Sequence, residues 1–270
     1  LARALEGLAW AILWPSLEFL VPSVYKDPKE ALRYYNIAWS LGALMGPILA
    51  GLLMTYFTIK VNFYLCSLSS LILSLLGFLF RDKKKEVQSI TVRSIKDIKG
   101  SLKLLYVPFT YSFTLAMVLT LFPPYASKLG LNPLEIGIVI FLYGIVKSLI
   151  FFFFPYMYKK EDREKIVNFS LLFLLTSPLL ILSNEKNLFL ISFSLLGLVI
   201  GLIYSLGLIE IVGEAPKEIR GSMAGIFEGT LGLGFFSGPL LGGLVAELDY
   251  RYSFLIPIFF LPILLKVLKS

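Results

Sequence analysis

Hydrophobic residues in this chain form long runs that are separated by short polar segments. A helix needs about 20 mostly apolar residues to cross the hydrocarbon core of a bilayer. Measured against that length, the pattern predicts nine spans, at residues 3–23, 36–57, 61–80, 103–123, 135–157, 166–182, 188–212, 221–246 and 252–268. We therefore expect an all-α fold, a polytopic membrane helix bundle.

The composition supports the bilayer as the solvent of this chain. Apolar residues make up 57% and charged residues 16%, whereas about 25% of the residues in soluble domains are charged. With no histidine, imidazole metal sites and histidine-based catalysis are excluded, and the single cysteine excludes an intramolecular disulfide. We expect no cofactor, no metal and no enzymatic activity, since no span contains an aspartate or an acidic dyad on facing positions.

The net charge of +7 is distributed by loop. Alternate loops and the C-terminus carry nineteen lysines and arginines, and the loops between them carry four. Cytoplasmic loops are enriched in basic residues, so the basic set, including the long segment 81–102, is expected to be cytoplasmic. The charge therefore reports topology in a cell membrane and does not predict a nucleic-acid partner.

Two glycine–proline stretches repeat 192 residues apart, GALMGPILAG at 42–51 and GFFSGPLLGG at 234–243. The shared positions and their neighbours are Gly42, Gly46, Pro47, Gly51, Gly234, Gly238, Pro239, Gly242 and Gly243. With this shift, the first three spans overlay the last three. The predicted organisation is three helices (1–80), a basic linker (81–102) and six helices (103–270). Because the chain starts without methionine, three further helices are expected upstream, giving twelve in two related sixes.

These features resemble the major facilitator superfamily of secondary transporters. The resemblance rests on the repeated Gly-Pro stretch, the basic central loop, and the R-x-x-x-G start carried by Arg3 and Gly7. It implies that this chain covers helices four to twelve. The loop after residue 157 departs from the family, because it keeps basic charge without the pattern G-x-x-x-D-R-x-G-R. Among family members the Gly-Pro stretch of the fifth helix is associated with drug–proton antiporters, which favours export.

Small residues recur every fourth position through both Gly-Pro stretches, from Ala38 to Ala50 and from Thr230 to Gly242. In lipid such a face lets helix backbones approach closely. The proline in each stretch lacks an N–H and favours a bend. Two interpretations are open: a static packing groove, or a bent contact between the two halves that seals in one state and parts in another.

Charged residues inside the spans are the candidates for substrate binding and proton coupling, because charge within a bilayer is costly. The first span has a stripe within about 60° of one line along the helix: Arg3, Glu6, Gly7, Trp10, Trp14 and Glu18. The stripe faces either a cavity or, through Arg3 and Glu6, the outer interface. Lys147 lies mid-span with Tyr143 one turn before it, and Glu228 contacts either substrate or a basic loop residue. Tyr111, Tyr204 and Ser205 are further cavity candidates.

A second group of charges lies at the expected cytoplasmic helix ends. Glu210, Pro216 and Arg220 occur in the order of the family's E…P…R charge relay, and Glu18 occupies the repeat position of Glu210. The resemblance implies ion pairs that latch the inner gate. The alternative is ordinary solvation of helix ends.

Together these features predict a carrier of small solutes that works by alternating access. The first expectation is a monomeric, proton-coupled exporter of amphipathic or drug-like compounds, with Arg3, Glu6 or Lys147 in coupling. The alternatives are proton-coupled uptake of a sugar, organic anion or other metabolite, with Arg3 and Lys147 binding carboxylate, and a non-transporting membrane receptor or scaffold.

Overall fold

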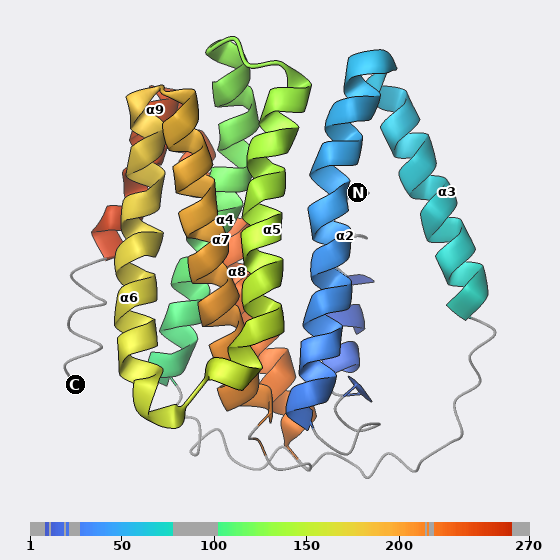
Figure 1. The fold of residues 1–270 in the computed structure, drawn as a ribbon, viewed down its shortest axis with the longest axis vertical. Helices are drawn as coiled ribbons and strands as arrows, with labels where there is room; N and C mark the ends of the chain where they lie inside the picture. The colour runs from blue at the N-terminus through green and yellow to red at the C-terminus, as the bar shows by residue number, and fades with distance from the viewer. Residues whose placement is uncertain are drawn as a thin grey trace.

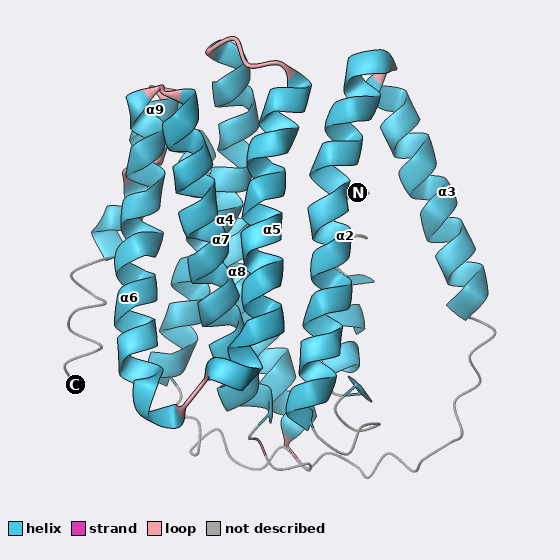
Figure 2. Ribbon diagram, viewed as in Figure 1, coloured by secondary structure: helices cyan, strands magenta, loops and turns pink. Residues whose placement is uncertain are grey.

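The structure is a computed structural model that describes residues 9–10, 12–18, 20–21, 28–77, 102–213, 215 and 219–260. All regular elements within these ranges are helical (Figure 2). In chain order they are α2 (Pro28–Tyr56), α3 (Ile59–Gly77), α4 (Leu102–Lys128), α5 (Pro133–Met157), η2 (Lys160–Asp162), α6 (Arg163–Thr176), η3 (Ser177–Ser183), α7 (Lys186–Gly207), η4 (Leu208–Gly213), α8 (Arg220–Ala246), α9 (Tyr250–Ser253) and η5 (Ile256–Phe260). Residues 12–18 are helical as well, and we call residues 9–21 the N-terminal segment.

Seven of the described helical stretches are long and apolar enough to cross a membrane. They coincide with the second to eighth predicted spans and confirm the helix-bundle prediction. The sixth is α6 continued by the 3-10 helix η3, where Pro178 lies one residue beyond the change of helix type. The first and ninth predicted spans, and the linker between α3 and α4, fall wholly or partly outside the described residues.

The long helices run side by side along one direction (Figure 1). α2 packs along α5, α5 packs on α7, and α4 packs on α8. α3 stands at an angle to the other helices, and none of its residues is buried. Its apolar side chains are those expected of a surface that faces lipid, since a bilayer needs no polar cover.

The start of α5 shows how local sequence sets a helix boundary. Asn132 accepts a hydrogen bond from the Glu135 N–H, and Glu135 accepts one from the Asn132 N–H, each at 2.9 Å. Such a capping box satisfies two of the backbone donors that every helix start leaves open. Glu135 also forms an ion pair with Lys186 at 2.8 Å, which joins the starts of α5 and α7.

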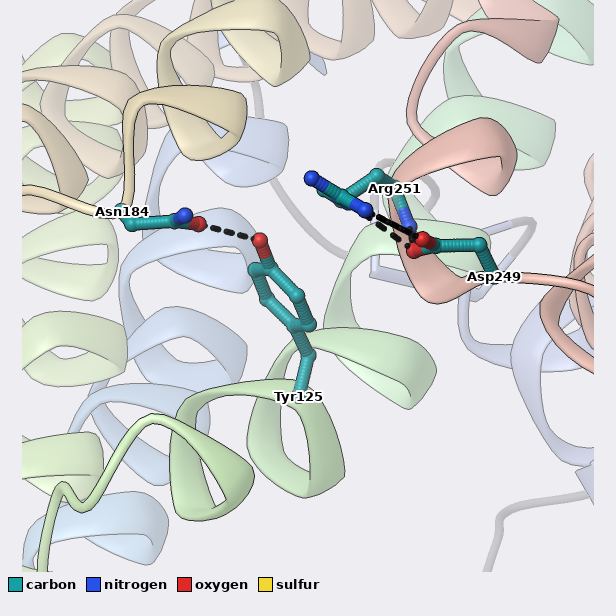
Figure 3. A network of polar contacts seen from close by, with 4 residues as sticks. All are labelled: Tyr125, Asn184, Asp249 and Arg251. Carbon is teal, nitrogen blue, oxygen red and sulfur yellow. Dashed lines mark hydrogen bonds and ion pairs between the residues drawn. The ribbon is translucent and has the colours of Figure 1, made fainter.

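Polar contacts also join helix ends near the starts of α5 and α7 (Figure 3). The Tyr125 hydroxyl, near the end of α4, donates to the Asn184 side chain, and Asn184 ends η3 with a left-handed φ of 61°. Asp249 caps α9 by accepting from the Arg251 N–H at 2.8 Å and pairs with the Arg251 guanidinium at 2.7 Å. This guanidinium holds the pKa of the exposed Asp249 carboxyl below its usual value.

The second Gly-Pro stretch packs as a small-residue face should. Gly234 and Gly238 lie against the backbone of Phe109 and Phe113, where an added Cβ would collide, and Gly242 lies against Met117. This close approach joins α8 to α4. Both helices follow the basic linker, so for this copy the contact favours the packing-groove interpretation.

The first Gly-Pro stretch packs differently from its copy. Gly42 and Gly46 are exposed, and no atom of the described residues lies within 4 Å of an added Cβ, so close packing of this face stays a prediction. α2 instead contacts α5 through a neighbouring face that carries Pro47 and Gly51. A Cβ on Gly137 of α5 would lie 2.9 Å from the Pro47 carbonyl oxygen. Because every face of a lipid-exposed helix is apolar, neighbouring helices decide which face is buried.

Candidate functional site

Lys147 is buried in the middle of α5, with 1% of its surface exposed. Along the helix axis it lies about 15 Å from Met157 and about 21 Å from Pro133. Its Nζ lies 4.1 Å from the centre of the Trp39 ring and 5.0 Å from that of Tyr143. Within the described residues its cation is held by aromatic faces and has no carboxylate partner, an arrangement that stabilises an ammonium group out of water.

Trp39 of α2 is the centre of an aromatic cluster. Its ring stacks on Tyr204 of α7, with centroids 5.5 Å apart, and lies 5.8 Å from Phe151 of α5. Trp14 of the N-terminal segment meets Trp39 edge to face at 6.4 Å. The cluster therefore joins helices on both sides of the basic linker.

Glu18 is fully buried beside this cluster. Its Oε1 accepts a hydrogen bond from the Tyr204 hydroxyl at 3.1 Å. Its carboxyl group also lies within hydrogen-bonding reach of the Glu228 carboxyl of α8. Glu18 and Trp14 thus face α7 and α2. Trp10 packs on Trp14 at 6.0 Å and is 55% exposed.

Two further tyrosines surround the acidic pair. Tyr35 of α2 adjoins the Tyr204 hydroxyl, and Tyr111 of α4 meets the Tyr204 ring edge to face at 6.3 Å. Both are buried. Together, buried charge of both signs and a wall of aromatic rings provide places for a proton, a polar group and an apolar body. The described residues contain no group of three or more side chains able to hold a metal ion.

The predicted relay residues make other contacts. Glu210 lies in the π-helical turn η4 and pairs with Arg163 at 2.8 Å and with the Tyr158 hydroxyl. The Arg220 guanidinium donates to the carbonyl oxygens of Gly213 and Ala215 at 3.2 and 3.1 Å. The π-helix extends α7 by one turn, so Glu210 lies beside Arg163 at the start of α6. Arg220, at the start of α8, binds the backbone of the segment that joins α7 to α8. Pro216 lies outside the described residues.

Sequence reasoning found Lys147, Glu18, Trp14, Tyr143, Tyr204 and Glu228 but did not find what joins them. It missed Tyr35, Trp39 and Phe151. The polar positions Arg33, Asn36 and Ser40 mark one side of α2 at helical spacing and could have indicated a buried face there. Arg3 and Glu6 lie outside the described residues, and Ser205 is buried next to Tyr204.

The site lies at a long contact between α2 and α5. The Ser148 hydroxyl donates to the Ser40 hydroxyl at 2.9 Å near the middle of this contact. At one end, a Cβ on Gly51 would lie 3.0 Å from the Pro133 carbonyl oxygen. At the other end, the Arg33 guanidinium lies 4.9 Å from the centre of the Tyr156 ring.

Comparison with known proteins agrees with this architecture. A multidrug resistance protein of Bacillus subtilis is 25% identical over 94% of this chain and 68% of its own length. An uncharacterized MFS-type transporter of Methanocaldococcus jannaschii is 23% identical over 92% of this chain and 68% of its own length. The sequence model of the Major Facilitator Superfamily matches residues 1–160 and 104–268. This multi-pass membrane protein therefore belongs to the Major Facilitator Superfamily, a family of transporters and not of enzymes.

Proposed function

We propose that this transporter exports amphipathic, drug-like compounds in exchange for protons, by alternating access. The observation that carries the proposal is the cluster of Lys147, Trp39, Tyr204 and Glu18, which lies where helices from both sides of the linker meet. A solute or proton bound there contacts both groups of helices, so its binding free energy differs between states in which they are together or apart. Such a difference is what couples a ligand to a conformational change.

The chemistry of the cluster favours a permissive site. Aromatic rings supply large apolar surfaces with no fixed hydrogen-bonding pattern, while a few charges orient the ligand. The name of the Bacillus subtilis relative, a multidrug resistance protein, points to the same class of cargo. In the proposed orientation the basic loops and the C-terminus are cytoplasmic, the membrane is the cell membrane, and the unit is a monomer.

Transport in proteoliposomes tests this proposal, with tetraphenylphosphonium and ethidium as probes. An inside-acid gradient is expected to drive accumulation of a probe, because protons leaving the vesicle exchange for it. Nigericin, which collapses the gradient in potassium buffer, should abolish the accumulation. Accumulation that is independent of the gradient would contradict proton exchange.

A role for Lys147 makes a sharper prediction in the same assay. Lys147→Met keeps the length of the side chain and removes its charge, so gradient-driven accumulation should fall about tenfold or more. Lys165→Met is the matched control, because the Lys165 side chain is 84% exposed and forms only a surface ion pair. Equal rates in the two variants would remove Lys147 from the proposed site.

A second candidate is proton-coupled uptake of an organic anion or other metabolite. It is favoured by one observation: the Lys147 ammonium is held by rings and is free to bind a carboxylate. An outside-acid gradient should then drive uptake of a monocarboxylate or sugar while leaving tetraphenylphosphonium unaffected. Accumulation of the cationic probe alone would decide against this candidate.

A further inference from the structure

Two carboxyl groups from distant parts of the chain meet in the interior. Glu18 belongs to the N-terminal segment and is fully buried, and Glu228 lies in α8 and is half-buried. Their carboxyl groups are within hydrogen-bonding reach of each other. This pair spans the basic linker and joins the helices before it to those after it.

One oxygen of the pair accepts no hydrogen bond from the described residues. Glu18 Oε1 accepts from Tyr204, whereas Glu18 Oε2 is buried and has no donor among the residues that the structure describes. The groups that face the pair are the hydroxyls of Tyr35 from α2, Tyr111 from α4 and Tyr204 from α7.

Charged groups of α5 lie further away from the pair. Lys147 lies over the ring of Trp39, which stacks on Tyr204, and Tyr143 of α5 contacts the same ammonium. Among the described residues, no lysine or arginine acts directly on the two carboxyl groups. Within the described part of the chain, their charge is therefore not balanced by an ion pair.

Two carboxylates in contact in a buried site cannot both be ionised at a tolerable free energy. One proton between them removes one charge and turns two acceptors into a donor and an acceptor. It also supplies the hydrogen bond that Glu18 Oε2 lacks. A buried carboxyl pair therefore binds a proton as a unit.

We propose that Glu18 and Glu228 share one bound proton, and that this proton joins the N-terminal segment to α8. The proposal deepens the proposed function and rests on it, because the shared proton is then the ion exchanged for the cargo. Binding converts one carboxylate and a proton into a carboxyl group, and release reverses this. Release leaves two like charges in contact, which favours separation of the two groups of helices.

Glycines flank Glu228 on α8. Gly225 and Gly232 lie one turn before and one turn after Glu228, on the same side of the helix. Both are exposed and have no atom within 4 Å of an added Cβ. No described side chain therefore covers α8 on the side next to Glu228, whereas the Glu18 side chain is buried.

The tryptophans report on the pair through Tyr204. The chain has 3 tryptophans, and Trp10, Trp14 and Trp39 form a chain of ring contacts that ends on Tyr204, the residue that donates to Glu18. Tryptophan fluorescence of the full chain in lipid nanodiscs, titrated between about pH 4 and 9, should show a transition with the slope of one proton.

Variants of each carboxyl group test the assignment. In a Lys147→Met background, which removes the other titratable group against Trp39, Glu18→Gln and Glu228→Gln should each displace the midpoint by about one pH unit or more, and the double variant should show no transition. Tyr204→Phe keeps the ring and removes the donor, so it should also displace the midpoint. Glu247→Gln, at an exposed position of the same region of the chain, should titrate as the wild type does. Circular dichroism establishes that each variant is folded.

Several outcomes would overturn the shared proton. Unchanged midpoints in both single glutamine variants would do so. A saturable fluorescence change with sodium at constant pH would also do so, because it would assign the pair to a metal cation.

The transport assay separates this proposal from the proposed function. If the pair does not titrate while a pH gradient still drives tetraphenylphosphonium, the shared proton is wrong and exchange stands. If the pair titrates in a protein that moves no probe, proton binding stands and export is wrong.

Discussion

Lys147 shows how far a single residue can be interpreted without its neighbours. Its depth in the membrane follows from sequence alone, because it lies mid-span and its ammonium cannot remain uncompensated there. Its partners could not be predicted, because Trp39 lies 108 residues away on α2 and is an ordinary apolar residue by pattern. The same holds for Glu18 and Glu228, which were assigned different roles and lie within hydrogen-bonding reach of each other.

Asp249 provides a residue-level test outside the membrane. Asp249→Ala removes the cap of α9 and the ion pair with Arg251, and should lower the melting temperature by about 2 °C at pH 7. Since the pKa of Asp249 is lowered in the folded protein, its contribution is fully present above the unfolded value of about 3.9 and is lost as pH falls through the folded value.

Melting curves between pH 3 and 8 measure this effect. The difference between Asp249→Ala and wild type should shrink only at the acid end of the range. Asp162→Ala is the matched control, because Asp162 forms a surface pair with Lys165 at 3.5 Å. A difference for Asp249→Ala that grows on acidification would contradict the pairing.

Among the elements, the seven complete spans were predictable because a run of about 20 apolar residues has few alternatives in a bilayer. The faces through which they pack were not. The same small-residue spacing packs tightly in α8 and is exposed in α2, since spacing shows where close approach is possible and neighbouring helices decide whether it occurs.

The α8 face gives an element-level prediction with a control in the same motif. Gly238→Ala places a Cβ against the Phe113 backbone and should destabilise the protein by about 1–3 kcal/mol. Gly243→Ala, five residues further on, meets nothing within 4 Å and should have little effect. Thermal unfolding in detergent measures both, and equal melting temperatures would mean that α4 and α8 are further apart than described.

For the whole molecule, the two copies of the Gly-Pro stretch have different neighbours despite their shared sequence. The copy in α8 binds α4 within the C-terminal helices, and the copy in α2 meets α5 across the basic linker. Repeat symmetry predicts equivalent positions for the two copies. It could not predict this difference, because each copy has a different environment in the assembled protein.

A disulfide across α2 and α5 tests whether these helices separate during transport. The hydroxyls of Ser40 and Ser148 are 2.9 Å apart, so Ser40→Cys with Ser148→Cys, in a Cys66→Ser background, should form a disulfide on oxidation. Alternating access requires the halves to move relative to each other. Oxidation should therefore reduce probe accumulation at least about tenfold, and dithiothreitol should restore it. Undiminished transport by the cross-linked protein would show that motion occurs elsewhere.

The close crossing of Gly51 and Gly137 lies near one end of both helices and so has a mechanical consequence. With no side chains between the two backbones, the crossing can serve as a pivot, and the rest of each helix as a lever arm. From Gly137 to Tyr156 that arm is about 28 Å long. A rotation of about 10° at the pivot would move the far end by about 5 Å, wider than a water molecule. A small tilt at one membrane face would thus open a path at the other.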